Sequence, residues 1–231
     1  MPLNILTIIP ARGGSKGIPG KNIIDVKGKP LIAYSIIPSL ELLKDGWVSK
    51  VIVSTDSQEI ADVARSFGAE VPFLRPDEIS GDKAKSVEFI QHALNFFLDQ
   101  GINFDAVLLL QPTSPLRTAE DLKKAIQLYQ ESQNDSLISA YEEEYINDLV
   151  IYKLDSDGKT SIPVSSLHNK GVRRQDHGST YVRNGCIYIT STDLIRKGFV
   201  IGEKPLMYVM DKNRSVNVDT YEDLELLRKM L

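Results

Sequence analysis

Residues 7–22, TIIPARGGSKGIPGKN, decide the fold and the chemistry expected of this 231-residue chain. Apolar residues lead into the stretch, and four glycines are then interleaved with Arg12, Lys16 and Lys21. Glycine lets the backbone turn and approach a ligand without a Cβ in the way, so successive N–H groups can converge on an anion. A buried strand that opens into such a cationic loop is typical of a polyphosphate site.

Two common phosphate loops do not fit this stretch. A P-loop needs glycine, four residues and then Gly-Lys-Ser/Thr, but Ser15 stands where the first glycine belongs and Asn22 where the hydroxyl is needed. A dinucleotide fingerprint needs glycines at i, i+2 and i+5, and positions 13, 14, 17 and 20 contain no such set. A loop can collect glycine and lysine by chance, but their density directly after an apolar run favours a ligand site.

Bulk properties argue against several classes of protein. The net charge of −4 gives no indication of a nucleic-acid or anionic-membrane partner. There is no apolar run of about 18 residues to cross a bilayer, and the N-terminus lacks the features of a signal peptide. The single cysteine, Cys186, excludes an internal disulfide and is interpreted as a core residue. We therefore expect a cytoplasmic protein.

Strand patterns alternate with helical patterns through the first part of the chain. Strands are expected at residues 4–10, 50–56, 71–74 and 104–110, and helices at 30–43, 57–67, 82–98 and from 119 onward. This alternation predicts an α/β fold, a Rossmann-like three-layer sandwich with a mostly parallel sheet and ligands at the carboxyl ends of its strands. Because the polar loops 11–22 and 111–117 both follow strands, they should share one crevice.

The pattern changes from about residue 136 to shorter, more alternating segments. They predict a small antiparallel insertion over residues 140–182, a candidate dimerisation arm on a single domain that spans 1–231. Strands are expected again at 187–190 and 207–210. A closing helix over 218–231 would be capped by Asp219 or Thr220.

Seven motifs follow one another along nearly the whole chain: ARGGSKGIPGKN, KPLIAYSI, VIVSTD, LLQPTSPLRT, RRQD, NGCIYIT and VDTYEDL. Together they resemble the acylneuraminate cytidylyltransferases, the CMP-sialic acid synthetases. The first motif and LQPTSPLR are specific, whereas STD and VDT alone are weak. The resemblance implies a fold of the nucleotide-diphospho-sugar transferase type. It also implies transfer of CMP from CTP to the anomeric hydroxyl of a nonulosonic acid, with release of pyrophosphate.

The cations of the opening loop are interpreted as triphosphate ligands. Cations and amides in a partly dry crevice hold the roughly four negative charges of a nucleoside triphosphate better than exposed groups would. By resemblance, Ser86 touches cytosine or ribose, although a helix N-cap would explain a serine there equally well. The residues expected to bind CTP are Ala11, Arg12, Gly13, Ser15, Lys16, Lys21, Asn22 and Ser86.

The sugar acid is expected beside a ledge, residues 111–117, in which two prolines pre-orient the side chains between them. A carboxylate favours a bidentate guanidinium, and the family's arginine at the RQ step corresponds to Arg174. Arg183 stands one residue later than the second arginine of the family's Tyr-Arg-x-Asn-Gly pattern, and in a strand a one-residue slip turns a side chain to the other face. The residues expected at the sugar acid are Gln111, Thr113, Ser114, Arg174, Arg183 and Asn184.

Asp219 precedes the closing helix, where a metal ligand and a helix cap look alike in sequence. By resemblance it anchors Mg²⁺, which usually takes one or two protein carboxylates together with phosphate oxygens. Asn217 stands where the family often has a second aspartate, so the number of metal ions stays open. The catalytic set is then Arg12, Lys21, Asp219 and Arg174, which act by positioning and charge, and the general base is not identified.

The resemblance also implies a homodimer in which the arm reaches the neighbouring crevice. Three alternatives stay open: an eight-carbon acceptor (KDO), a legionaminic or other nonulosonic acid, and a catalytically idle nucleotide-binding subunit, which Asn217 makes conceivable. Which nonulosonic acid is used, and which glycan receives it, are left undecided by the sequence.

Overall fold

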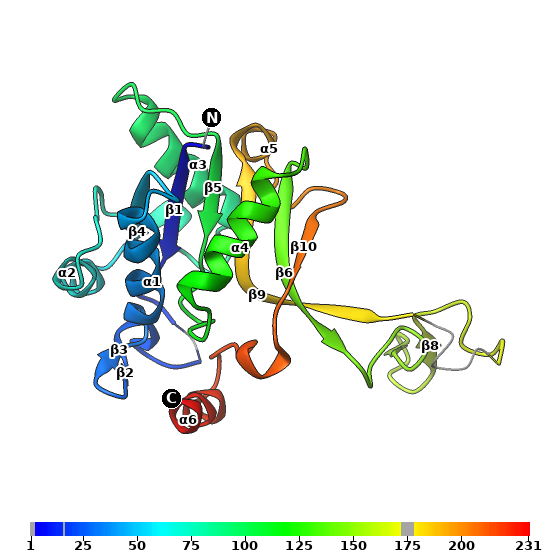
Figure 1. Cartoon of the computed structure of the whole chain (residues 1–231). Helices are drawn as coiled ribbons and strands as arrows, with labels where there is room; N and C mark the ends of the chain where they lie inside the picture. Colours follow the sequence, from blue (N-terminus) through cyan, green and yellow to red (C-terminus); the bar gives the residue numbers. More distant parts are fainter. Residues whose placement is uncertain (1–2, 16, 172–177) are drawn as a thin grey trace.

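The computed structural model describes residues 3–15, 17–171 and 178–231, and a six-stranded sheet forms its centre (Figure 1). The strand order is β10-β6-β9-β5-β1-β4, and every strand runs parallel to its neighbours except β9, which lies antiparallel between β5 and β6. The predicted mostly parallel sheet is therefore confirmed. The strands are β1 (Ile5–Pro10), β4 (Lys50–Ser54), β5 (Ala106–Leu109), β6 (Ser136–Glu143), β9 (Thr180–Ser191) and β10 (Leu206–Val209).

Helices cover both faces of the sheet, because neighbouring strand residues point to opposite sides. Ile5 of β1 belongs to the core under α1 (Ala33–Lys44), α2 (Gln58–Ser66) and α4 (Ala119–Gln130). Leu6 belongs to a second core under α3 (Ser86–Leu98) and α5 (Thr192–Arg196). The result is the three-layer sandwich expected from the sequence. Among the described residues, no helix combines the length and apolar character needed to span a membrane.

A third, smaller core joins the glycine-rich loop to the end of the chain. It lies between the two-stranded sheet of β2 (Asp25–Val26) and β3 (Lys29–Pro30) and the last helix, α6 (Tyr221–Met230). Ile18 from the loop and Val218 from the segment before α6 are both fully buried in it. This packing brings residues from opposite ends of the sequence to the same edge of the sheet.

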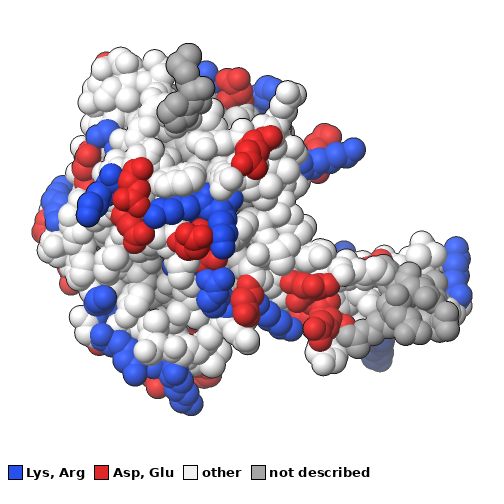
Figure 2. Space-filling view, viewed as in Figure 1, with Lys and Arg blue, Asp and Glu red and all other residues white. Residues whose placement is uncertain are grey.

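An arm projects from the body where β6 and β9 continue beyond the edge of the sheet (Figure 1). It carries the hairpin of β7 (Tyr152–Leu154) and β8 (Ser161–Pro163). Figure 2 shows basic and acidic side chains mixed over this face of the body, with acidic side chains gathered where the arm begins. The insertion expected over residues 140–182 corresponds to this arm.

Most element boundaries agree with the prediction, but the strand expected at residues 71–74 does not form. Only isolated bridges form here, between Glu70 and Ile52 of β4 and between Leu74 and Thr55, and Pro72 lacks the N–H that a continuous ladder needs. The helix expected over 82–98 begins at Ser86, and the helix expected from residue 30 begins at Ala33. The predicted cap at Thr220 is confirmed, since its side chain accepts a hydrogen bond from Asp223 N, and the side chains of Ser57 and Thr118 cap α2 and α4 in the same way.

Candidate functional site

A cleft of about 570 Å³ opens at the carboxyl ends of β1 and β5. The loops 11–22 and 111–117 both contribute to it, so the predicted shared crevice is confirmed. The segment between β4 and α3 forms another of its walls. The lining residues are Pro10, Arg12, Ser15, Gly17, Lys21, Asn22, Arg75, Ile79, Ser80, Gly81, Asp82, Ala84, Ser86, Phe89, Gln111, Pro112, Thr113 and Asp219.

The glycine-rich loop is held in shape by groups of the protein itself. Gly13 N donates to Asp56 Oδ1 at 2.8 Å, and the buried Asn22 side chain donates to Arg12 O at 3.0 Å. Gly17 packs so closely that a Cβ there would lie 2.4 Å from Asp219 O. Only glycine allows this approach. These contacts hold the described part of the loop, residues 11–15 and 17–22, in one shape.

Two of the predicted triphosphate ligands point into the cleft, and each is paired with a carboxylate. Arg12 Nη1 lies 2.7 Å from Asp82 Oδ1. Lys21 Nζ lies 2.8 Å from Asp219 Oδ1 and donates to Val218 O at 3.0 Å. An anion that enters the cleft must compete with these carboxylates for the two cations. Lys16 lies outside the described residues.

Arg75 is a third cation of the cleft, and sequence reasoning missed it. Its side chain is buried, donates from Nε to Ser54 Oγ at 3.1 Å and stacks 4.7 Å from the centre of the Phe89 ring. Burial lowers the pKa of Arg75 to about 10, so it stays charged at neutral pH. No sequence motif marks it, because only the tertiary fold brings the segment after residue 70 to the cleft.

The ledge at residues 111–117 is held from below by a buried arginine. Arg117 donates from Nη1 to the carbonyl oxygens of Gln111 (2.9 Å) and Ser114 (2.6 Å), and from Nη2 to the Ser35 hydroxyl. Burial lowers its pKa to about 10. Gln111 and Thr113 face the cleft, whereas Ser114 is 1% exposed and packs beneath the ledge.

A second hollow, of about 440 Å³, lies on the other side of Gln111 and Thr113. Arg183 faces it, with its guanidinium 6.0 Å from the centre of the Tyr188 ring. Residues five apart point to opposite faces of a regular strand, but Gly185 has φ +76° and the β6–β9 register shifts nearby. This irregularity brings Arg183 and Tyr188 to one side. The lining residues are Gln111, Thr113, Tyr141, Val182, Arg183, Asn184, Gly185, Tyr188, Ser215 and Asn217.

Comparison with known proteins shows the family to which this chain belongs. The family model described as "Cytidylyltransferase" matches residues 6–230, which is nearly the whole chain. The chain belongs to the cytidylyltransferase family. This confirms the resemblance seen in its motifs.

Several relatives named as cytidylyltransferases or CMP-sugar synthases are similar over almost all of this chain. It is 36% identical over 224 residues to the pseudaminic acid cytidylyltransferase of Campylobacter jejuni, with 96% of this chain and 94% of the relative covered. It is 34% identical over 232 residues to the CMP-N,N'-diacetyllegionaminic acid synthase of Legionella pneumophila, with 99% and 97% covered. It is also 36% identical over 231 residues to the N-acylneuraminate cytidylyltransferase of Escherichia coli, covering 98% of this chain but only 52% of that longer protein.

Solved structures agree with the fold of this cytidylyltransferase. The CMP:2-keto-3-deoxy-manno-octonic acid synthetase complexed with CTP superposes with a TM-score of 0.71 over 98% of both chains. A 4-diphosphocytidyl-2C-methyl-D-erythritol synthase superposes with a TM-score of 0.65 over 99% of both chains. At 17% and 14% identity, these likenesses bear on the fold alone.

The remaining predicted site residues of the cytidylyltransferase have varied surroundings. Ser86 lines the cleft as the first residue of α3, and the N-cap position belongs to Lys85, whose N–H donates to Glu88 Oε2 at 2.8 Å, so a capping role for Ser86 is wrong. Ala11 is fully buried and donates from its backbone N–H to Ser54 O at 3.0 Å. Asn184 lines the second hollow, but its side-chain amide is already bonded to Ser139 of β6, to Cys186 N of its own strand and to Ser215. Arg174 lies outside the described residues.

Asp219 is the carboxylate best placed to hold a metal ion in this cytidylyltransferase. Its side chain is 61% exposed at the cleft, with Lys21 on one oxygen and the Asn217 amide on the other. Within residues 3–15, 17–171 and 178–231, no three His, Cys, Asp or Glu side chains form a metal-binding group. This donor set fits Mg²⁺ held by one carboxylate, with phosphate oxygens and water as its other ligands.

Proposed function

We propose that this cytidylyltransferase transfers CMP from CTP to the anomeric hydroxyl of a nonulosonic acid and releases pyrophosphate. One observation carries the proposal: the pre-formed ledge of Gln111 and Thr113 is shared by a cationic cleft and by a second hollow that contains Arg183. A nucleotide in the cleft and an acidic sugar in the hollow would meet at this ledge. The names of the relatives, which specify pseudaminic, legionaminic and N-acylneuraminic acids, support a nonulosonic acceptor.

The cleft supplies the charge that a nucleoside triphosphate requires. Arg12, Lys21 and Arg75 offer three cations, and the backbone of the glycine-rich loop adds N–H donors. Arg12 and Lys21 leave their carboxylate partners for phosphate oxygens and stabilise the charge on the α-phosphate and the departing pyrophosphate. Because the acceptor hydroxyl attacks phosphorus directly, positioning and electrostatic stabilisation suffice and no protein nucleophile is required.

The acceptor is oriented by the ledge and by arginine. Gln111 and Thr113 offer hydrogen bonds to hydroxyl groups, and Arg183 offers a guanidinium to an acidic or acylated substituent. Arg174 remains the residue that the RRQD motif suggests for binding the sugar carboxylate. Which of the nine-carbon acids fits is decided by the shape of the second hollow rather than by the nucleotide cleft.

Mg²⁺ belongs to this proposal as the cofactor held by Asp219. When bound, it neutralises phosphate charge and polarises a phosphoryl oxygen. Asn217 donates to Asp219 and fixes the orientation of the carboxylate. Lys21 lies on the other carboxylate oxygen and keeps a cation close to the same phosphates.

The arm supports a homodimer as the working form of the enzyme. Large apolar side chains are exposed along it, which is unusual for a surface that faces only water. A second copy of the chain could cover them and bring the arm of one protomer towards the crevice of its partner. The exposed side chains of the arm include Tyr145, Ile146, Val150, Tyr152, Leu154 and Ile162.

We also propose that the enzyme works in the cytoplasm, because CTP is available there.

Pyrophosphate release from CTP and Mg²⁺ tests the proposal with a panel of acceptors: N-acetylneuraminic, pseudaminic and legionaminic acids, and KDO. We expect turnover with at least one nine-carbon acid, and for that acid a kcat/KM at least about tenfold above that for KDO. Turnover with none of them would favour the idle nucleotide-binding subunit. A preference for KDO would leave the reaction class intact but overturn the acceptor.

A further inference from the structure

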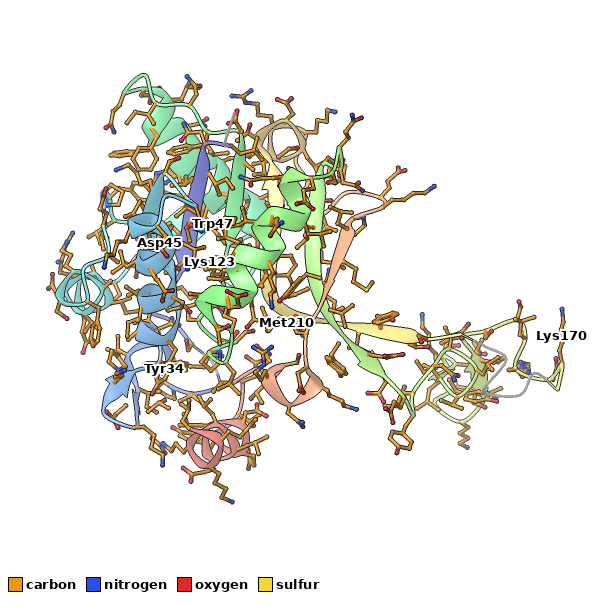
Figure 3. All side chains as sticks on the ribbon, in the orientation of Figure 1. Tyr34, Asp45, Trp47, Lys123, Lys170 and Met210 are labelled. Carbon is orange, nitrogen blue, oxygen red and sulfur yellow. The ribbon has the colours of Figure 1, made fainter. Side chains whose placement is uncertain are left out.

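Residues 211–219, here called the strap, connect β10 to α6 and end at Asp219. The strap begins directly after Met210, which lies where the body meets the arm (Figure 3). Its regular structure is limited to the short 3-10 helix η4 (Lys212–Arg214). The internal backbone hydrogen bonds of the strap lie within residues 211–215, so the part that leads to Asp219 depends on contacts with other elements to hold it in place.

The strongest of these contacts is the ion pair between Arg214 and Asp121. Arg214 Nη2 lies 3.0 Å from Asp121 Oδ1, and Nη1 donates to Oδ2, so the pair is bidentate. Asp121 is 4% exposed and also accepts from Thr118 N at 2.8 Å and Tyr208 OH at 3.1 Å. A bidentate guanidinium–carboxylate pair fixes direction as well as distance. Arg214 is therefore clamped onto a rigid anchor.

That anchor belongs to the same unit as the ledge. Asp121 lies in the first turn of α4, and α4 follows the ledge after a single residue, Thr118. Further along the strap, Val218 N donates to Thr113 O at 2.7 Å. Lys21 Nζ then bonds both Val218 O and Asp219 Oδ1. A continuous path of contacts thus runs from Asp121 through the strap to the cation and carboxylate of the cleft.

We propose that Arg214 is a positioning residue for the transfer reaction. By binding Asp121 it holds the strap against the ledge, and so fixes Asp219 and Lys21 relative to the groups that orient the acceptor. The inference rests on the proposed function, because it assigns Arg214 a part in bringing the two substrates together. Arg214 is not among the residues that line the cleft or the second hollow, and it acts through the strap alone.

Other contacts keep the strap attached when Arg214 is replaced. Lys212 Nζ lies 2.7 Å from Glu143 Oε2, and Asn184 Nδ2 donates to Ser215 Oγ at 2.8 Å. Both contacts tie the strap to β6 and β9 at the base of the arm. Loss of the Arg214 pair should therefore loosen the part of the strap that leads to Asp219 without unfolding the domain.

The test compares Arg214→Gln and Arg214→Lys with the wild-type enzyme. Loss of a residue that orients a ligand-holding group commonly costs about 10–100-fold in activity. We expect kcat of Arg214→Gln to fall by about this factor, with KM for CTP within about threefold of wild type. Lysine keeps the charge but not the bidentate geometry, so Arg214→Lys should recover part of kcat. Arg228→Gln is the matched control, because Arg228 is comparably exposed and pairs with Glu225 on α6.

Hydrogen–deuterium exchange provides a readout that does not depend on turnover. Peptides covering 211–219 should exchange faster in Arg214→Gln, while peptides covering α4 and β1 keep wild-type protection. Unchanged exchange in the strap, or a wild-type kcat, would overturn the proposal. A parallel fall in kcat, CTP affinity and melting temperature would also overturn it, because such a result would mean that Arg214 only stabilises the fold. The proposed function is tested by turnover of the wild-type enzyme, whereas the role of Arg214 is tested by the difference between the variant and the wild type. Each proposal can therefore fail without the other.

Discussion

Lys21 Nζ lies 2.8 Å from Asp219 Oδ1, although 198 positions separate the two residues in the chain. The small core that contains Ile18 and Val218 brings them together. The pair joins a cation suited to phosphate and a carboxylate suited to Mg²⁺ at one edge of the cleft. A triphosphate and its metal ion could therefore bind there together, each taking one member of the pair.

Replacing Asp219 should abolish most of the activity. Asp219→Asn removes the proposed metal anchor together with the carboxylate partner of Lys21, and we expect kcat/KM to fall by about 10²–10³-fold. Pyrophosphate release measured over a Mg²⁺ titration gives the value. Asp193→Asn, an exposed carboxylate on α5, serves as the control. Activity of Asp219→Asn within threefold of wild type would rule out Asp219 as the anchor.

Gly17 and Gly14 should respond very differently to alanine. A Cβ at Gly17 would lie 2.4 Å from the Asp219 carbonyl oxygen, whereas a Cβ at Gly14 meets no atom within 4 Å. Overpacking of this kind costs about 1–3 kcal/mol, so Gly17→Ala should lower the melting temperature by several degrees. Gly14→Ala should leave it nearly unchanged. Equal melting temperatures for the two variants would contradict the close packing of the loop on the strap.

Arg183 should affect the acceptor and not the nucleotide. It faces the second hollow and is absent from the lining of the cleft. In Arg183→Gln we expect KM for the sugar acid to rise about tenfold or more, because one charge-assisted hydrogen bond is lost. KM for CTP should stay unchanged. Arg196→Gln, on the exposed side of α5, is the matched control. If KM for CTP rose together with KM for the sugar acid, Arg183 would not belong to a separate acceptor site.

A charge on the arm should disrupt assembly. Leu154 of β7 is exposed in the single chain, and burying an aspartate in an apolar contact is costly. We expect Leu154→Asp to elute as a monomer under conditions where the wild type is a dimer, measured by size-exclusion chromatography with light scattering. Leu226→Asp introduces the same change at an exposed site on α6 and should remain dimeric. A monomeric wild type would refute the dimer.

The ion pair of Asp121 should make stability depend on pH. Burial alone raises the pKa of this carboxyl, but the hydrogen bonds from Arg214 and Thr118 outweigh it, so the pKa is lowered. Such a group stabilises the fold above its unfolded-state pKa, about 3.9, and this contribution is lost as the pH falls through the folded-state value.

Asp121→Asn should therefore lower the free energy of unfolding at neutral pH, and its difference from wild type should shrink below about pH 4. Urea titrations from about pH 3 to pH 7 measure this difference. A gap that stays constant across the range would mean that the charge of Asp121 does not stabilise the fold.

The sequence predicted the features that depend on local patterns. The strand before the glycine-rich loop, the cap of the last helix at Thr220, and the crevice shared by two loops all follow from spacing and topology. Residues placed by tertiary packing were harder to predict. Thr113 and Ser114 look equivalent in sequence, yet only Thr113 faces the cleft, because the turn of the ledge buries its neighbour.

Arg75 and Arg183 illustrate the same limit. Arg75 reaches the cleft from the position directly after the strand expected at residues 71–74, and no motif marked it. Arg183 faces the second hollow because Gly185 adopts a positive φ in the middle of β9. A periodicity argument assumes a regular strand and cannot anticipate such a local irregularity.

Among the described residues, only Gln111 and Thr113 line both the cleft and the second hollow. The outer wall of the hollow is built by Tyr141, Val182 and Arg183, and these residues belong to the strands that run into the arm. Under the proposed function, substitutions in this wall change acceptor binding while leaving the nucleotide cleft intact. Relatives of similar identity that are named for different sugars are consistent with this modularity. For protein engineering, a library of substitutions confined to these wall positions is the direct way to seek an enzyme that activates a different sugar.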